Sequence, residues 1–230
     1  MRLSLLALAL FAAPVFAQSN ADSYRPGDVD ASAVQPYEAQ YRIFVIQGAG
    51  SGMPFGTMSE SLSIEDGVAL STVHVNGAGQ TQRDSAWFSW PEMEPIRFRS
   101  EANGAVKELA FDGLAVSGTL RDGSALDVTL DAAAFGQGVA DIIARTLPME
   151  DGATASFYAF DDDTEDYVST TTLTVGAVEQ VLGREARVIT SESPSNSVTM
   201  WYDAEADQML QVAFSPQPGI TVELRRSDLD

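Results

Sequence analysis

The amino-acid sequence predicts a mainly β protein: a curved antiparallel sheet, a half-barrel or open barrel of about 10–12 strands, around one α-helix. Three observations support this fold class. Asx-Gly dipeptides recur along the chain, apolar and polar residues alternate with a period of two between them, and a single segment has helical apolar spacing. The chain has no cysteine, so its apolar core has to hold this fold together without disulfides.

The N-terminus has the features of a secretory signal peptide. A basic start is followed by an apolar run too short to span a bilayer, and small residues stand at the −3 and −1 positions before Gln18. We therefore expect residues 1–17 to be removed after Ala17 and the mature protein to be periplasmic. Residues 18–35 are polar and are predicted to form a flexible leader, and residues 36–230 to form a single β-rich domain.

The first half of this domain is predicted to be a meander of hairpins. Residues 37–46 alternate as a strand, with the apolar side chains of Tyr37, Ala39 and Tyr41 on one face. Asx-Gly pairs, which suit tight hairpin turns, occur at 66–67, 76–77, 103–104, 112–113, 122–123 and 151–152. The strands expected between these pairs are 62–64, 68–75, 96–101, 106–111, 114–120 and 126–130.

One segment departs from this pattern and predicts the helix. Residues 131–147 carry Val139, Ile142, Ile143 and Leu147 at helical spacing, with Asp131 as a candidate cap and Pro148 as the stop. Its apolar side has to be buried, and a sheet curved over it would do so. Strands then resume at 154–160, 167–175, 186–192, 197–203, 209–214 and 220–224.

Composition excludes several classes of function. The formal net charge of −20 disfavours binding to nucleic acids and to anionic lipid surfaces, and is typical of a soluble acidic protein. Without cysteine there is no thiol nucleophile or thiolate metal site, and the single histidine, His74, cannot form a His-based metal site alone. No cofactor is predicted.

Two motifs have a structural and a functional interpretation. The glycine-rich run 48–56 is close to a dinucleotide loop, but strand-like alternation follows it where a helix is required, so a hairpin connection is favoured. The run 161–166 places Asp161, Asp163 and Glu165 at alternate positions that suit calcium. The EF-hand template fails at its glycine and final glutamate positions, so an acidic hairpin loop is the default interpretation.

Aromatic residues and His74 are the remaining candidates. Trp87 and its neighbour Phe88 should point to opposite sheet faces, as should Trp201 and Tyr202. Core packing is the first interpretation of these aromatics. If one side of the sheet is not core, ligand-binding candidates are Trp87, Trp90, Trp201 and Tyr202. His74 is interpreted as a structural residue on a strand face, and no catalytic residue is assigned.

Several short segments resemble a bacterial exported family known only as a domain of unknown function. These segments are Leu147–Gly152, Val198–Asp203, Thr221–Leu224, Tyr37–Tyr41 and Glu94–Phe98, and the resemblance extends over roughly residues 37–226. Members of that family are similar to the periplasmic lipoprotein-carrier half-barrel. The resemblance implies a curved sheet with an apolar concave face and a ligand cavity, although carriers have several helices where this chain predicts one.

Three functional interpretations follow. The first is a soluble, non-enzymatic periplasmic protein with a lipid-like or other apolar ligand on the concave face. The alternative is an envelope scaffold or assembly partner that binds another envelope protein through a surface patch. The third is a hydrolase using His74 or a carboxylate pair, which requires His74 in a cleft beside an acid and a hydroxyl. No nucleic-acid partner and no transmembrane segment in the mature chain are expected.

Overall fold

The computed structural model describes residues 23–206 and 208–229. It contains fifteen strands and one α-helix. The strands are β1 (Ser23–Tyr24), β2 (Tyr37–Gln47), β3 (Met53–Glu65), β4 (Val68–Gly77), β5 (Gln80–Ser89), β6 (Pro95–Ala102), β7 (Ala105–Asp112), β8 (Ala115–Thr119), β9 (Ala125–Thr129), β10 (Thr154–Phe160), β11 (Val168–Val181), β12 (Arg184–Glu192), β13 (Ser197–Asp203), β14 (Met209–Gln217) and β15 (Ile220–Arg226), and the helix is α1 (Ala140–Thr146).

All these strands belong to one open sheet in the order β1-β10-β11-β12-β13-β14-β15-β2-β3-β4-β5-β6-β7-β8-β9. Consecutive strands pair antiparallel, β15 pairs antiparallel with β2, and the two-residue β1 adds in parallel to β10. The predicted fold class is therefore confirmed, with more strands than the expected 10–12. One extra strand is β5, which begins after a turn at Ala78-Gly79 because the expected turn pair 76–77 continues β4 instead.

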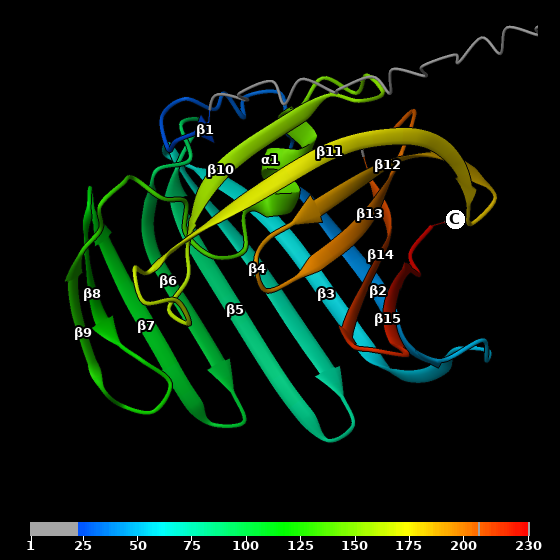
Figure 1. Cartoon of the computed structure of the whole chain (residues 1–230), viewed down its shortest axis with the longest axis horizontal. Coiled ribbons are helices and arrows are strands. Elements are labelled where there is room, and N and C mark those ends of the chain that lie inside the picture. The colour runs from blue at the N-terminus through cyan, green and yellow to red at the C-terminus, as the bar shows by residue number, and fades with distance from the viewer. Residues whose placement is uncertain (1–22, 207, 230) are drawn as a thin grey trace, which may run out of the picture.

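The sheet curls so that its two ends face each other across α1. Figure 1 shows β10 and β11 crossing on one side of the helix and β3 to β5 passing on the other. The T-shaped contact of Phe111 on β7 with Phe160 on β10, at 5.5 Å between ring centroids, joins the two ends. The helix residues Ile142, Ile143 and Ala144 are completely buried between them. The predicted sheet curved around one helix is confirmed.

The helix is much shorter than predicted. It begins after Val139, which caps it without a side-chain hydrogen bond, so the expected start at Asp131 is wrong. Gly138 takes a positive φ of 81°, which a right-handed helix does not contain. Upstream, Phe135 forms an isolated bridge with Ala159 at the edge of β10, so residues 131–139 follow the sheet edge before the helix starts.

The segment before β2 also differs from the expectation. Residues 18–35 were expected to be a flexible leader with little to bury, yet Val29, Ala31 and Val34 are buried in the hydrophobic core. The backbone N–H of Gly27 donates to the carbonyl of Glu92, which ties this segment to the β5–β6 connection. The packed part of the chain therefore begins before residue 36. The predicted signal peptide lies outside the described residues.

The hairpin turns follow the turn chemistry expected from the sequence at several places. Asp66 and Gly67 both have positive φ, as do Asn103 and Gly104, as the favoured two-residue hairpin turns require. The glycine-rich run 48–56 connects β2 to β3 and runs into β3 itself, which confirms its interpretation as a hairpin connection. No helix within residues 23–206 and 208–229 is long and apolar enough to cross a membrane.

Gly118 provides a test of the β7–β8 pairing. Its φ is +154°, and a Cβ at this position would lie 2.0 Å from the carbonyl oxygen of Glu108 on the neighbouring strand. We expect Gly118→Ala to lower the free energy of unfolding by about 2 kcal/mol, since backbone atoms have to move to admit the methyl group. Urea denaturation measures this change, with Gly113→Ala, where nothing lies within 4 Å of the added Cβ, as the comparison for strain from positive φ alone.

Candidate functional site on the concave face

The concave face of the sheet carries a buried polar cluster beneath α1. Strand alternation and register place Tyr37 of β2 and Glu60 of β3 on this face. Tyr37 lies opposite Leu62, and Glu60 lies opposite Ala39. Leu62 and Ala39 are both buried, so their partners also point inward. Glu60 is only 6% exposed. A glutamate therefore occupies an inward position between Met58 and Leu62, where an apolar residue is expected.

The helix supplies the other half of the cluster. Asp141 and Arg145 are four residues apart and share one side of α1. The Tyr37 hydroxyl lies 2.7 Å from Oδ2 of Asp141 and also contacts Oε1 of Glu60. Since one hydroxyl has a single proton to donate, one of these two carboxyl groups has to donate a proton of its own. Tyr37 thus joins β2, β3 and α1 through a proton-dependent contact.

Burial and charge shift the protonation of this cluster. Burial, and then the negative charge of Asp141, raise the pKa of Glu60 to about 8, so Glu60 keeps its proton at neutral pH. Burial together with the same carboxylates raises the pKa of Tyr37 and of Tyr202 well above the ordinary tyrosine value. The phenols therefore remain neutral donors.

Arg145 supplies the positive charge of the cluster. Its guanidinium lies 4.1 Å from the centroid of the Tyr37 ring and 5.7 Å from that of the Tyr202 ring, both cation–π distances. Burial is the largest single influence and would lower the pKa of Arg145, but the charge of Asp141 together with Tyr37, Tyr202 and Glu60 outweighs it and raises that pKa. The Tyr202 hydroxyl donates to the backbone carbonyl of Asp141 at 3.3 Å, so β13 also holds the helix.

A polar band extends from Glu60 across the same face. Cross-strand register aligns Glu60 with Val73, Asp84, Ser100 and Lys107 on β4 to β7. Gln82 donates to Asp84 at 2.7 Å, and Arg121 donates to Ser100 at 2.8 Å. The family resemblance implied an apolar concave face, but this face also carries polar side chains.

Beyond this band the concave face presents a half-buried apolar surface, which we call the concave strip. Register places its side chains in two groups. One follows the pairs Val198–Phe214, Phe214–Val222 and Val222–Val45, and the other is the pair Met58–Val75, which adjoins Tyr41 rather than Val45. The concave strip consists of Val45, Met58, Val75, Val198, Val212, Phe214 and Val222, all of which pack only partly against the core. Met58 and Val75 are each two residues along their strand from the polar band, about 7 Å away.

Side chains leave little room in the core beside the start of the helix. The pocket that reaches the core beside Phe88, Phe98 and Val139 has a volume of only about 10 Å³. This is no more than the space that a single water molecule needs. A ligand on the concave face would therefore lie along the concave strip rather than inside an enclosed cavity.

The structure does not bring the four predicted aromatic candidates together. Phe88 is buried, whereas Trp87 is half-buried on the convex face under the guanidinium of Arg97, at 5.0 Å from its ring centroid. Trp90 packs against the core, 6.4 Å from Phe88. Trp201 donates from Nε1 to Glu179 at 2.9 Å, while its neighbour Tyr202 is buried in the polar cluster. The expected opposite orientation within each pair is thus seen, and Tyr202 alone joins the site.

The acidic run 161–166 forms the turn between β10 and β11. Asp161 accepts a hydrogen bond from the backbone N–H of Asp163, and Asp162, which is not one of the calcium candidates, pairs with Lys107. Within the described residues no group of three or more His, Asp or Glu side chains is arranged to hold a metal ion. Calcium binding by Asp161, Asp163 and Glu165 stays a prediction.

His74 lies exposed on the convex face of β4, opposite Ser59 on β3 and Arg83 on β5. Within residues 23–206 and 208–229 it makes no hydrogen bond or ion pair with an acidic side chain. The arrangement that a hydrolase mechanism through His74 requires is therefore not formed here. The carboxylate pair that the structure does form is Glu60 and Asp141.

Sequence reasoning missed Tyr37, Glu60, Asp141 and Arg145 as one group. The signal that could have found Glu60 is its position within Met58, Leu62 and Ile64, since period-two alternation places it on the apolar side of β3. The i, i+4 spacing of Asp141 and Arg145 could have indicated a shared helix side. No local pattern indicates that these pairs meet.

No family model matches this chain, and no curated protein matches it. A solved structure, the hypothetical lipoprotein YmcC from Escherichia coli (K12), is similar over 84% of this chain and 89% of its own, with 17% sequence identity and a TM-score of 0.32. This degree of similarity identifies neither a family nor a ligand. The resemblance to the exported family and to the carrier half-barrel stays a prediction.

Proposed function

We propose that the protein is a non-enzymatic, exported binding protein that holds an amphipathic, lipid-like ligand on the concave face of its sheet. The observation that supports this proposal is the concave strip, a set of half-buried apolar side chains beside a polar band on one curved face. Isolated apolar side chains on a protein surface are ordinary, but a contiguous set with a polar border is typical of a binding surface.

The chemistry of this face suits a ligand with one apolar and one polar part. An acyl chain or comparable apolar group would cover Phe214, Val222 and Val45. Each Å² of apolar area removed from water in this way favours binding by about 25 cal/mol. A polar head would reach Gln82 and Asp84, the half-buried members of the band next to Val75. Hydroxyl or amine donors on that head would match the Asp84 carboxyl group.

The proposal is tested by binding of an apolar fluorescent probe, N-phenyl-1-naphthylamine, to the purified protein. We expect Phe214→Ser and Val222→Ser each to weaken probe binding at least tenfold, since each removes apolar area from the concave strip. Leu70→Ser on the convex face is the matched control and should leave the affinity unchanged. Equal probe binding by all four proteins would contradict the proposal.

Native mass spectrometry of the protein from its own envelope adds a second measurement. We expect a bound species of lipid-like mass that Phe214→Ser loses. A protein that is ligand-free in both forms would count against the carrier role.

An envelope scaffold or assembly partner is the second candidate, favoured by one specific surface. The edge strand β9 has no neighbour on its outer side among the described residues. Near the turn into β8, a pocket of about 430 Å³ is lined by Ile96, Phe111 and Leu114, and Ile96 and Leu114 are 41% and 42% exposed. Chemical cross-linking in the native envelope would capture one consistent protein partner, and Leu114→Asp would abolish that product if this role were correct.

A further inference from the structure

The convex face of β3 to β5 carries a single carboxylate, that of Glu65 at the end of β3, although the chain has 33 acidic residues. Alternation and register place one set of side chains outward on these strands, opposite to Glu60 and Asp84. We call this set the convex field: Thr57, Ser59, Ser61, Ser63, Leu70, Thr72, His74, Asn76, Thr81, Arg83, Ser85 and Trp87. The 2.7 Å hydrogen bond between the hydroxyls of Ser61 and Thr72 confirms that the outward side chains of β3 and β4 share one face.

Arginines border this field on both sides. Arg42 of β2 is the cross-strand partner of Thr57, and Arg97 and Arg99 of β6 are the partners of Trp87 and Ser85. Arg97 and Arg99 form exposed ion pairs with Glu108 and Glu101. Arg42 and Arg83 are exposed and form no ion pair with any described residue, so their charge is available to a ligand.

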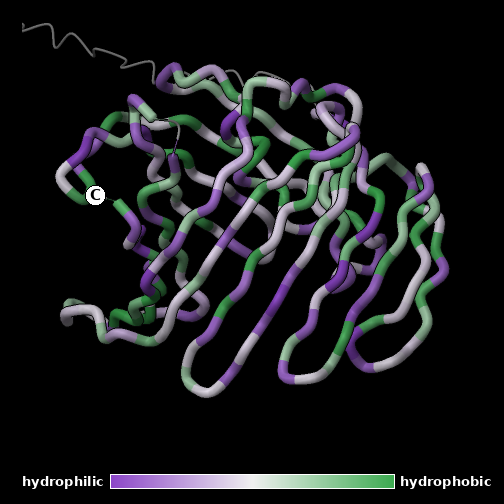
Figure 2. The backbone as a smooth tube through the Cα atoms, turned by 180° about the vertical axis from the view of Figure 1, so that it is seen from behind, coloured by the Kyte–Doolittle hydropathy of each residue, from purple (hydrophilic) through white to green (hydrophobic). Residues whose placement is uncertain are grey.

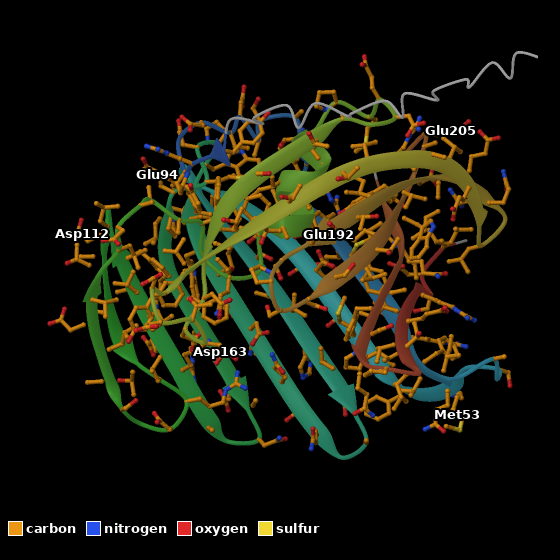
Figure 3. All side chains as sticks on the ribbon, in the orientation of Figure 1. Met53, Glu94, Asp112, Asp163, Glu192 and Glu205 are labelled. Atoms are coloured by element: carbon orange, nitrogen blue, oxygen red, sulfur yellow. The ribbon has the colours of Figure 1, made fainter. Side chains whose placement is uncertain are left out.

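Two carboxylates border the convex field, because Glu38 of β2 is the cross-strand partner of Ser61 and Glu101 of β6 is that of Arg83. Other acidic residues lie outside it. Glu94, Asp112, Asp163, Glu192 and Glu205, the carboxylates labelled in Figure 3, lie in connections or at strand ends. Figure 2, seen from the side away from β10 and β11, shows the long hairpins with hydrophilic and intermediate segments along their length. Because salt screens distant charges beyond about 8 Å at physiological ionic strength, an anion on the convex field interacts mainly with the groups beside it, which are Arg42 and Arg83 together with Glu38 and Glu101.

Two shallow pockets lie side by side on this field. One, of about 520 Å³, is lined by Arg42, Ser59, His74 and Asn76 among others. The second, of about 260 Å³, is lined by Leu70, Arg83 and Trp87 and bordered by Arg99 and Glu101. His74 of the first pocket and Arg83 of the second are cross-strand partners, so the two pockets are neighbours across β4 and β5.

We propose that the convex field binds an acidic glycan, a carbohydrate chain that carries carboxylate groups. Guanidinium groups of Arg42 and Arg83 pair with carboxylates, and the serine, threonine and asparagine side chains exchange hydrogen bonds with sugar hydroxyls. Trp87 is half-buried with the Arg97 guanidinium 5.0 Å from its ring centroid, so the apolar side of a sugar ring would rest on the planar surface that Trp87 and Arg97 form together. A protein partner fits less well, because Leu70 and Trp87 are the only large apolar side chains of the field, and the centre of a protein interface is normally apolar.

The test is a binding titration of the full protein with oligogalacturonate and oligoalginate as the acidic glycans. Maltooligosaccharide is the neutral glycan and oligoglutamate the acidic peptide. We expect both acidic glycans to bind, more weakly as salt rises, with the neutral glycan and the peptide at least tenfold weaker. Arg42→Gln, Arg83→Gln and Trp87→Ala should each weaken acidic-glycan binding at least tenfold. Arg25→Gln, the same charge change outside the convex field, should not.

Other outcomes overturn the proposal. Failure of both acidic glycans to bind, equal binding of the neutral glycan, or equal binding of oligoglutamate would each do so, the last in favour of an acidic protein partner. Urea denaturation of each variant shows whether it is folded. Binding of the apolar probe should be unchanged in Arg83→Gln, so that a failure here is distinct from a failure of the proposed concave-face ligand.

Discussion

Raising the pH from 6 to 8 is expected to destabilise the fold by about 3 kcal/mol through Glu60, and Glu60→Gln is expected to remove this loss. In the folded protein burial raises the pKa of Glu60 to about 8, from an ordinary value of 4.5. Between these two values the unfolded chain has released the proton while the folded protein still holds it. Stability therefore falls by about 1.4 kcal/mol for each pH unit and becomes constant above about pH 8.

The measurement is urea denaturation of wild type and variant at intervals from pH 5 to 9. Glutamine has nearly the shape of protonated glutamate, and its amide N–H can replace the proton that Glu60 donates toward Tyr37, so Glu60→Gln should be flat over this range and more stable than wild type at pH 9. Glu65→Gln, an exposed position on the same strand, is the control and should keep the wild-type slope. A wild-type curve without slope between pH 6 and 8 would show that Glu60 is ionised in the fold.

Removing the Lys107 ammonium should destabilise the protein by about 3–5 kcal/mol, the usual cost of leaving one member of a buried ion pair alone. Lys107 lies on β7, with a side chain only 9% exposed, and bonds both carboxylate oxygens of Asp162 at 2.8 and 3.0 Å and Gln137 at 2.9 Å. Although burial alone would raise the pKa of Asp162, the hydrogen bond and charge of Lys107 lower it. This contact joins one end of the sheet to the β10–β11 turn at the other.

A double-mutant cycle separates the ion pair from its burial. Lys107→Met keeps the apolar stem over the Phe98 ring, where the Lys107 nitrogen lies 5.4 Å from the ring centroid, and leaves Asp162 unpaired. We expect Lys107→Met with Asp162→Leu to recover most of the lost stability, since neither charge then remains. The exposed pair Arg99 and Glu101 is the control, for which Arg99→Met should cost less than about 1 kcal/mol. A similarly small cost at Lys107 would show that the pair contributes little to holding the two ends together.

Much of the fold could be predicted because strands and turns are local. The alternation in residues 37–46 is confirmed as β2, and the Asp66-Gly67 and Asn103-Gly104 pairs form the turns that their positive φ values favour. The helix length was overestimated because residues 131–139 contain apolar side chains that pack at the edge of β10 instead. Phe135 shows this, since it is completely buried yet lies outside the helix.

The candidate site could be predicted only in part. Tyr202 was singled out for its aromatic ring, and its strand and inward orientation are as expected. The residues around Tyr202 in the site could not be predicted. With 33 acidic residues many pairs are possible by chance, and no local pattern indicates that Glu60 and Asp141 are neighbours. The concave face was expected to be apolar, but it also carries a band of polar residues. The register of β3 to β7 aligns these residues, and this register is not visible in the sequence.

By itself the sequence determined the fold class, the absence of disulfides and the acidity of the protein, because these depend on composition and on side-chain spacing along one strand. Which charged and polar side chains are in contact depends on the tertiary structure. Tyr37 and Asp141 are 104 residues apart, as Lys107 and Asp162 are 55 apart, and each pair forms only when the sheet curls around α1. Such contacts bring together segments that are far apart in the sequence. The periodicity within one strand or helix does not indicate which distant segment lies beside it.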